Sequence, residues 1–146
     1  MEPNKTYTFE VEANFGSLSK ETVNKLFTDG RVASHFLEEQ LTEWFPDLTF
    51  VDGKGYDHVD IENNQYDQKS FTKRGTIYAP SNMVGKGRKI DEAVFHAHAK
   101  NISYILTDVI DFPTVRVVFK RGSDLLKEYP NGKIPLNARS VIFDKE

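Results

Sequence analysis

Apolar and polar residues alternate near the start of the chain, over residues 7–15. Such alternation is typical of a strand that buries one face and exposes the other. The residues of the apolar face are Phe9, Val11, Ala13 and Phe15, and those of the polar face are Glu10, Glu12 and Asn14. The sequence therefore predicts a half-buried strand in this region.

Helical spacing of apolar residues replaces the alternation in the next part of the chain. Val23, Leu26 and Phe27 indicate a first helix, with Ser17 or Ser19 as its N-cap. Gly30 is expected to interrupt or end this helix. A second helix is predicted from Val32 to a stop at Pro46, because proline cannot continue a helix. Its apolar positions are Val32, Phe36, Leu37, Leu41, Trp44 and Phe45.

A β-hairpin is predicted after a short strand at residues 48–51 and a glycine-containing turn at residues 53–55. Its strands are residues 57–61 and 65–72, joined by the polar turn Glu62-Asn63-Asn64. If Ile61 and Gln65 flank the turn, Val59 lies opposite Asp67 and Asp57 lies opposite Lys69. Side chains alternate faces along a strand, so Asp57, Asp67 and Lys69 would share one face. A slip of one residue would exchange the faces of Asp57 and Asp60, so both stay open as candidates.

The rest of the chain completes one α/β (α+β) domain over residues 1–146, with a mixed central sheet flanked by helices. A polar loop is expected over residues 79–87, a helix over residues 90–99, and strands over residues 103–109 and 114–120. The tail from Gly132 is expected to be a strand or an irregular packing segment. We find no internal repeat and no linker that would divide the chain.

Composition excludes several classes of protein. The 146 residues are 38% hydrophobic and 12% aromatic, which is enough for one packed core. The chain has no cysteine, which excludes a disulfide framework and a thiolate zinc site. No apolar run is long enough to cross a bilayer, and there is no signal-peptide pattern at the start. We therefore expect a soluble, intracellular (cytoplasmic) protein with no membrane partner.

The shared face of the predicted hairpin indicates metal chemistry. Magnesium prefers oxygen ligands and is typically held by one or two carboxylates together with waters and a substrate phosphate. Asp57 and Asp67 would supply the carboxylates, and Lys69 would position an attacking water. Mn²⁺ is the expected substitute for Mg²⁺. The alternative is a pair of exposed strand acids, with Lys69 in a surface ion pair.

This arrangement resembles the PD-(D/E)XK nuclease superfamily over roughly residues 34–119. Asp57 matches the first acid of the family pattern, and Asp67-Gln68-Lys69 matches the second motif, with Asp where Glu is commoner. The resemblance implies a restriction-endonuclease-like core: a helix, three strands, a further helix and another strand. It also implies an Mg²⁺-dependent DNA endonuclease of restriction or phage type, working as a homodimer. A helical acid, Glu38 or alternatively Glu39, would help to bind the metal through a water.

Basic residues follow the motif within a short span. They are Lys73, Arg74, Lys86, Arg88 and Lys89. Such residues hold phosphates and displace counterions, which makes binding sensitive to salt. We expect them to contact DNA; the alternative is an ordinary solvated loop.

Two rival functions also fit the sequence. The first is a catalytically silent module on a nuclease-like fold that binds nucleic acid or a protein. The second is a zinc enzyme built on the four histidines His35, His58, His96 and His98. Residues two apart on a helix point to different faces, so His96 and His98 are not expected to share a metal. His98 would instead contact a substrate phosphate or remain a surface residue.

Overall fold

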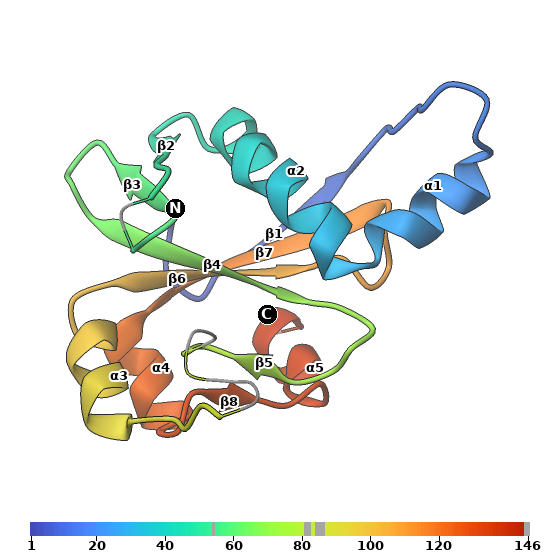
Figure 1. Ribbon diagram of the computed structural model, residues 1–146. Helices are drawn as coiled ribbons and strands as arrows, with labels where there is room; N and C mark the ends of the chain where they lie inside the picture. Colours follow the sequence, from blue (N-terminus) through green and yellow to red (C-terminus); the bar gives the residue numbers. More distant parts are fainter. Residues whose placement is uncertain (54, 81–82, 84–86, 145–146) are drawn as a thin grey trace.

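A six-stranded mixed sheet forms the centre of the computed structural model, which describes residues 1–53, 55–80, 83 and 87–144. The strand order is β1-β7-β6-β4-β3-β2, and β4 and β6 run parallel while the other neighbours run antiparallel (Figure 1). The strands are β1 (Thr6–Glu10), β2 (Leu48–Phe50), β3 (His58–Asp60), β4 (Gln65–Phe71), β6 (Ser103–Asp108) and β7 (Thr114–Arg121).

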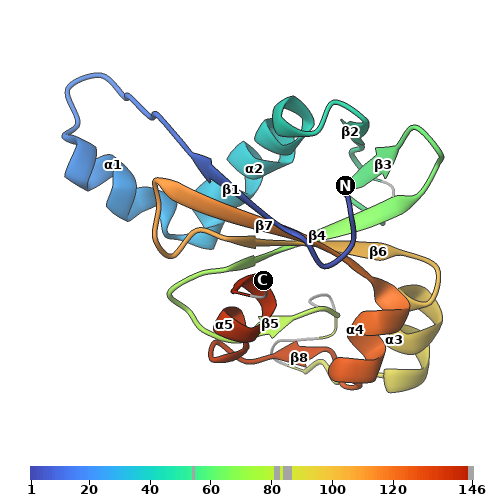
Figure 2. The same ribbon diagram turned by 180° about the vertical axis from the view of Figure 1, so that it is seen from behind.

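Helices cover both faces of this sheet. On one face lie α1 (Lys20–Phe27) and α2 (Gly30–Trp44). On the other face lie α3 (Glu92–Ala99), α4 (Gly122–Glu128) and α5 (Ala138–Phe143), together with a small second sheet of β5 (Ile77–Tyr78) and β8 (Lys133–Ile134). Figures 1 and 2 show the two layers from opposite sides. The predicted α/β class, with a mixed sheet flanked by helices, is confirmed.

Each layer encloses its own hydrophobic cluster. Leu37 and Leu41 of α2 pack with Ile105 and Val117 of the sheet on one face. Phe95 of α3 lies in a second cluster with strand residues of the opposite face, among them Phe71, Tyr104, Leu106 and Val118. Strands β6 and β7 alternate between the two clusters, so they are apolar on both faces, as expected for strands covered on both sides.

Local signals placed the first helices well. Ser19, one of the two predicted caps, accepts a hydrogen bond from the Thr22 backbone N–H and begins α1. Gly30 does separate two helices, but it lies at the start of α2, where Asp29 is the N-cap. Pro46 follows the end of α2 at Trp44, and Asp91 caps α3 through the Val94 N–H.

Three parts of the chain differ from the prediction. The first strand ends at Glu10 and not near Phe15, because its partner β7 begins at Thr114, which pairs with Glu10. The predicted loop begins beside a short strand, β5, which pairs with β8 far along the chain. The tail predicted as a strand or irregular segment contains β8 and then the helix α5.

Among the described residues, no helix combines the length and the apolar character needed to span a membrane.

Candidate active site

The central hairpin forms, with a different register from the one predicted. His58 pairs with Tyr66 and Val59 pairs with Gln65. Continuing this register places Asp57 beside Asp67, whereas the sequence prediction placed it beside Lys69. The shift is two residues, one full side-chain period, so alternation still predicts one face for positions 57, 67 and 69. Asp57 itself lies in the bend just before β3, and its carboxylate contacts β4 at Gln68. The predicted pairing was wrong, but the predicted common face does not depend on it.

Strand β4 has an open edge next to these residues. It pairs with β6 from Tyr66 to Phe71, but with β3 only through Gln65 and Tyr66. Asp57 lies at this fork: its backbone N–H donates to the Tyr66 carbonyl at 2.9 Å. One of its carboxylate oxygens, Oδ2, accepts a hydrogen bond from the Gln68 backbone N–H at 2.8 Å. The fork therefore holds the Asp57 carboxylate against the strand that carries Asp67 and Lys69.

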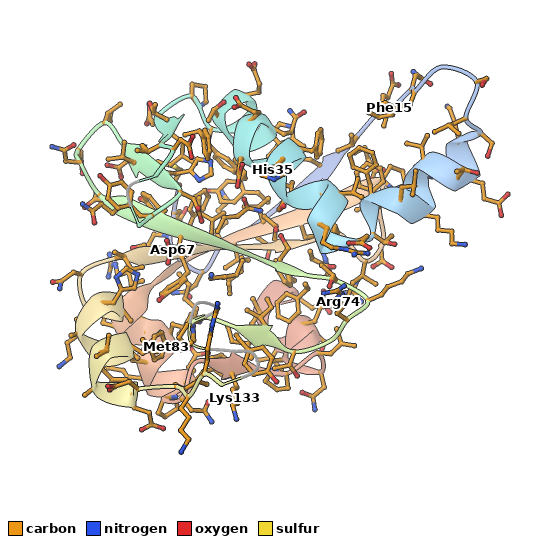
Figure 3. The ribbon with its side chains drawn as sticks, viewed as in Figure 1. Phe15, His35, Asp67, Arg74, Met83 and Lys133 are labelled. Carbon is orange, nitrogen blue, oxygen red and sulfur yellow. The ribbon has the colours of Figure 1, made fainter. Side chains whose placement is uncertain are left out.

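A cleft of about 850 Å³ opens at this fork. Asp57, Asp67 and Lys69 all line it, and so do Glu38 and Glu39 of α2. Figure 3 shows Asp67 on β4, between the helix that carries His35 and the opposite layer that carries Met83. The structure thus brings the four predicted catalytic residues, Asp57, Asp67, Lys69 and Glu38, to one concave site.

Asp67 lies deep in this cleft. Its side chain is 14% exposed, and its Oδ2 lies 3.3 Å from Nε2 of His98 on α3. Burial raises the pKa of the Asp67 carboxyl above its ordinary value, Asp57 adds to the rise, and Lys69 and His98 partly offset it. The positive charge beside Asp67 therefore does not fully offset the effect of burial on its carboxylate. A cation at the site would add further positive charge.

Glu38 reaches the same cleft from α2. Its side chain is 21% exposed, and Oε2 lies 3.1 Å from Nδ1 of His35, whereas Glu39 is exposed to solvent. Within the described ranges, no group of three or more His, Asp or Glu side chains lies close enough to hold a metal ion. Magnesium typically takes only one or two carboxylate ligands from the protein, and water and phosphate complete its coordination shell. Asp57 and Asp67 fit this pattern.

Asp60, the alternative to Asp57, has a different role in the structure. Its Oδ1 accepts from the backbone N–H groups of Glu62 and Asn64, and its Oδ2 accepts from the Asn64 side chain and the Tyr66 hydroxyl. Burial acts to raise the pKa of Asp60, but these hydrogen bonds outweigh it and lower the pKa below its ordinary value. Asp60 closes the hairpin turn at a distance from the open edge.

The four histidines are divided among separate contacts. Nε2 of buried His58 lies 2.9 Å from the Glu38 carbonyl, and Nε2 of His96 lies 2.6 Å from the Pro130 carbonyl. His96 and His98 are both on α3 and have different partners, as the helical spacing predicted. The contact between His98 and Asp67 was not predicted, because it joins residues 31 positions apart and no local pattern signals it.

Four of the five predicted DNA-contacting residues lie outside the cleft lining. Lys73 and Arg74 are exposed in the turn after β4, and Arg88 and Lys89 are exposed before α3. Among the described residues that line the cleft, none of these four is present. Lys86, the fifth, lies outside the described residues.

The fold and the site thus define a mixed α/β protein with an acidic cleft at the open edge of a central strand. No family model matches the chain, and neither the curated proteins nor the solved structures contain a match.

Proposed function

We propose that the chain is a metal-dependent DNA endonuclease that hydrolyses phosphodiester bonds at this cleft. One observation carries the proposal: Asp57, just before β3, and Asp67 of β4 line one cleft together with Lys69, at the fork between the two strands. Strands are poor in aspartate, and two carboxylates on one face repel each other unless positive charge lies between them. The raised pKa of Asp67 is consistent with a site that gains from added positive charge.

The residues divide the chemistry as follows. Asp57 and Asp67 would hold Mg²⁺, or Mn²⁺ in its place, and Glu38 would assist through a water. When bound, the cation supplies neutralising charge at the phosphate and lowers the pKa of water. Lys69 would orient the attacking water, whose oxygen forms a bond to phosphorus as the bond to the leaving oxygen breaks. The water would lose a proton to solvent, and the leaving oxygen would take a proton from solvent. The Lys69 ammonium also stabilises the charge that develops on the phosphate oxygens.

The order of the elements supports a restriction-endonuclease-like core as part of this proposal. Helix α2, strands β2, β3 and β4, helix α3 and strand β6 follow one another, with β5 as a short addition. This is the order that the family resemblance implies. DNA as the substrate, and a homodimer that cuts both strands, also belong to the proposal, because fold alone does not fix function.

A nicking assay on supercoiled plasmid tests the proposal. The purified chain is expected to convert the plasmid to open circles with Mg²⁺ or Mn²⁺, and excess EDTA is expected to stop the reaction. Asp67→Ala and Lys69→Gln are expected to reduce the rate by at least about a hundredfold. Asp124→Ala, on α4 and outside the cleft lining, is the matched control and is expected to leave the rate unchanged. Nicking that persists in Asp67→Ala would refute the site.

A binding module without catalysis is the second candidate. One observation favours it: Lys73, Arg74, Arg88 and Lys89 are exposed and lie outside the lining of the cleft, so they could bind a partner away from it. A catalytically silent module would bind DNA or a protein but would cleave no DNA in the presence of Mg²⁺ or Mn²⁺. Gel-shift and nicking assays on the same preparation separate the two candidates.

A further inference from the structure

The cleft has apolar surface facing its charged residues. Asp67 and Lys69 lie on β4, and the layer on the opposite side contributes Pro80, Met83 and Val94 to the lining. Val94 lies on α3 and is 54% exposed, so its side chain is accessible from the cleft. Tyr56, half-buried in the segment between β2 and β3, lines the cleft next to Asp57 in the chain. The site therefore combines carboxylates with accessible apolar and aromatic surface.

These two kinds of surface favour different parts of a nucleic acid. The outside of a duplex presents charged phosphates, so it gains little from contact with Val94 or Met83. A nucleobase has an apolar face, and aromatic side chains stack on it whatever the base. In a duplex that face is covered by neighbouring base pairs, so exposing it costs unstacking energy. The cost is smallest where the nucleotide is already single-stranded.

We propose that the cleft takes an unpaired nucleotide, with its base against Tyr56 and Val94 and its phosphate at the Asp57–Asp67 pair. The preferred substrate is then single-stranded DNA, or a single-stranded end, bulge or flap, in place of a continuous duplex. This inference rests on the proposed function: it keeps the hydrolytic site and replaces the homodimer that cuts both strands of a duplex with a chain that cuts unpaired DNA. Contact with a base face and not with its edge predicts weak dependence on base identity.

The test compares one fluorescein-labelled 12-nucleotide strand with the same strand annealed to its complement. Binding is measured by anisotropy in Ca²⁺, and cleavage is measured in Mg²⁺ at the same salt concentration. The single strand is expected to bind and to be cut at least about tenfold better than the duplex. Tyr56→Ala is expected to weaken single-strand binding about tenfold, and Tyr56→Phe, which keeps the ring, is expected to stay within about twofold.

Val94→Thr provides a second variant, because it keeps the side-chain shape on an exposed helical position and replaces one methyl group with a hydroxyl. It is expected to weaken single-strand binding and to leave duplex binding unchanged. The inference is overturned if the duplex is bound or cut as well as the single strand, or if Tyr56→Ala and Val94→Thr bind like the parent chain.

Failure of the inference is distinguishable from failure of the proposed function. If both DNAs are cleaved equally and Asp67→Ala abolishes the cleavage, the proposed nuclease function stands and the proposed base-binding cleft is refuted. If the single strand is bound preferentially but nothing is cleaved, the proposed base-binding cleft stands and the proposed nuclease function is refuted.

Discussion

Asp57 is bonded through its side chain to the backbone of the strand beside it: its Oδ2 accepts the Gln68 N–H at 2.8 Å. The main-chain pairing of β3 and β4 has ended two residues earlier, at Tyr66. The carboxylate therefore occupies the place where the next ladder hydrogen bond would lie. This contact fixes one oxygen of the proposed ligand and orients the carboxylate at the open edge.

Two substitutions separate the structural and chemical roles of Asp57. Asp57→Asn keeps an acceptor oxygen for the Gln68 N–H but removes the charge, so we expect cleavage to fall by at least about a hundredfold with little change in stability. Asp57→Ala also loses the hydrogen bond and should lower the free energy of unfolding by about 1 kcal/mol. Urea unfolding and plasmid nicking measure the two effects. An Asp57→Asn variant that cuts like the parent chain would contradict the proposed ligand.

The hydrogen bonds that Asp60 accepts in the hairpin turn, called here the Asp60 clamp, predict that the stability of the fold depends on pH in the acid range. Hydrogen bonds lower the folded-state pKa of Asp60 below its unfolded value of 3.8. The contribution of Asp60 is therefore fully present above that value and is lost as the pH falls through the lower folded-state pKa. Asp60→Ala is expected to cost about 1–2 kcal/mol at pH 7 and less at the acid limit, as judged by urea unfolding across pH.

Glu62→Gln is the matched control for the clamp. It removes a neighbouring turn charge and leaves the hydrogen bonds to Asp60 in place. If it and Asp60→Ala change the acid dependence equally, the effect comes from general turn charge and not from the clamp.

Salt dependence tests the basic residues after β4. If Lys73 and Arg74 contact phosphates, Lys73→Gln and Arg74→Gln should each weaken binding to all DNA sequences alike. Each should also reduce the slope of log affinity against log salt by about 0.7–0.9. Lys127→Gln on α4 is the control and should leave the slope unchanged. Filter binding over a series of salt concentrations measures the slope. Unaltered slopes for Lys73→Gln and Arg74→Gln would show that this turn is an ordinary solvated loop.

Gly122 permits the close contact between α4 and the end of α3. A Cβ at this position would lie 1.8 Å from the Ala99 carbonyl oxygen and 2.4 Å from that of Ile102. Gly122→Ala is therefore expected to lower the free energy of unfolding by about 3 kcal/mol or more, because both obstacles are backbone atoms. Thermal or urea unfolding measures the loss.

Gly16→Ala provides the comparison for this prediction. Gly16 has φ +54°, and a Cβ added there would meet no atom of the described residues within 4 Å, so only the backbone conformation penalises alanine. A cost of about 1 kcal/mol is expected. Equal costs at the two positions would contradict the steric reason given for Gly122.

The hairpin shows how far local sequence determines this site. Alternation alone placed Asp57, Asp67 and Lys69 on one face, and a register error of two residues leaves that conclusion intact. The register itself depends on the turn. Asp60 accepts hydrogen bonds from Glu62 and Asn64, and Asn63 adopts φ +68°, so the turn begins one residue earlier than predicted. Turn geometry of this kind is set by side-chain bonds that periodicity does not report.

Long-range neighbours were beyond prediction for a different reason. The contact of His98 with Asp67 depends on where the connection between the parallel strands β4 and β6 places α3. The pairing of Ile77 with Ile134, and the apolar surface at Val94, likewise join segments far apart in the chain. No spacing within either segment indicates its partner.

The unequal pairing of β4 has a consequence for how the proposed activity could be lost. Two register pairs join it to the hairpin arm that carries Asp57, whereas six join it to β6 in the interior. Partial opening of a structure begins where the fewest contacts must break, so amide protons in this arm should exchange with solvent well before those of the interior. The proposed catalysis would then be lost through local opening of this arm, with no change in the global melting transition.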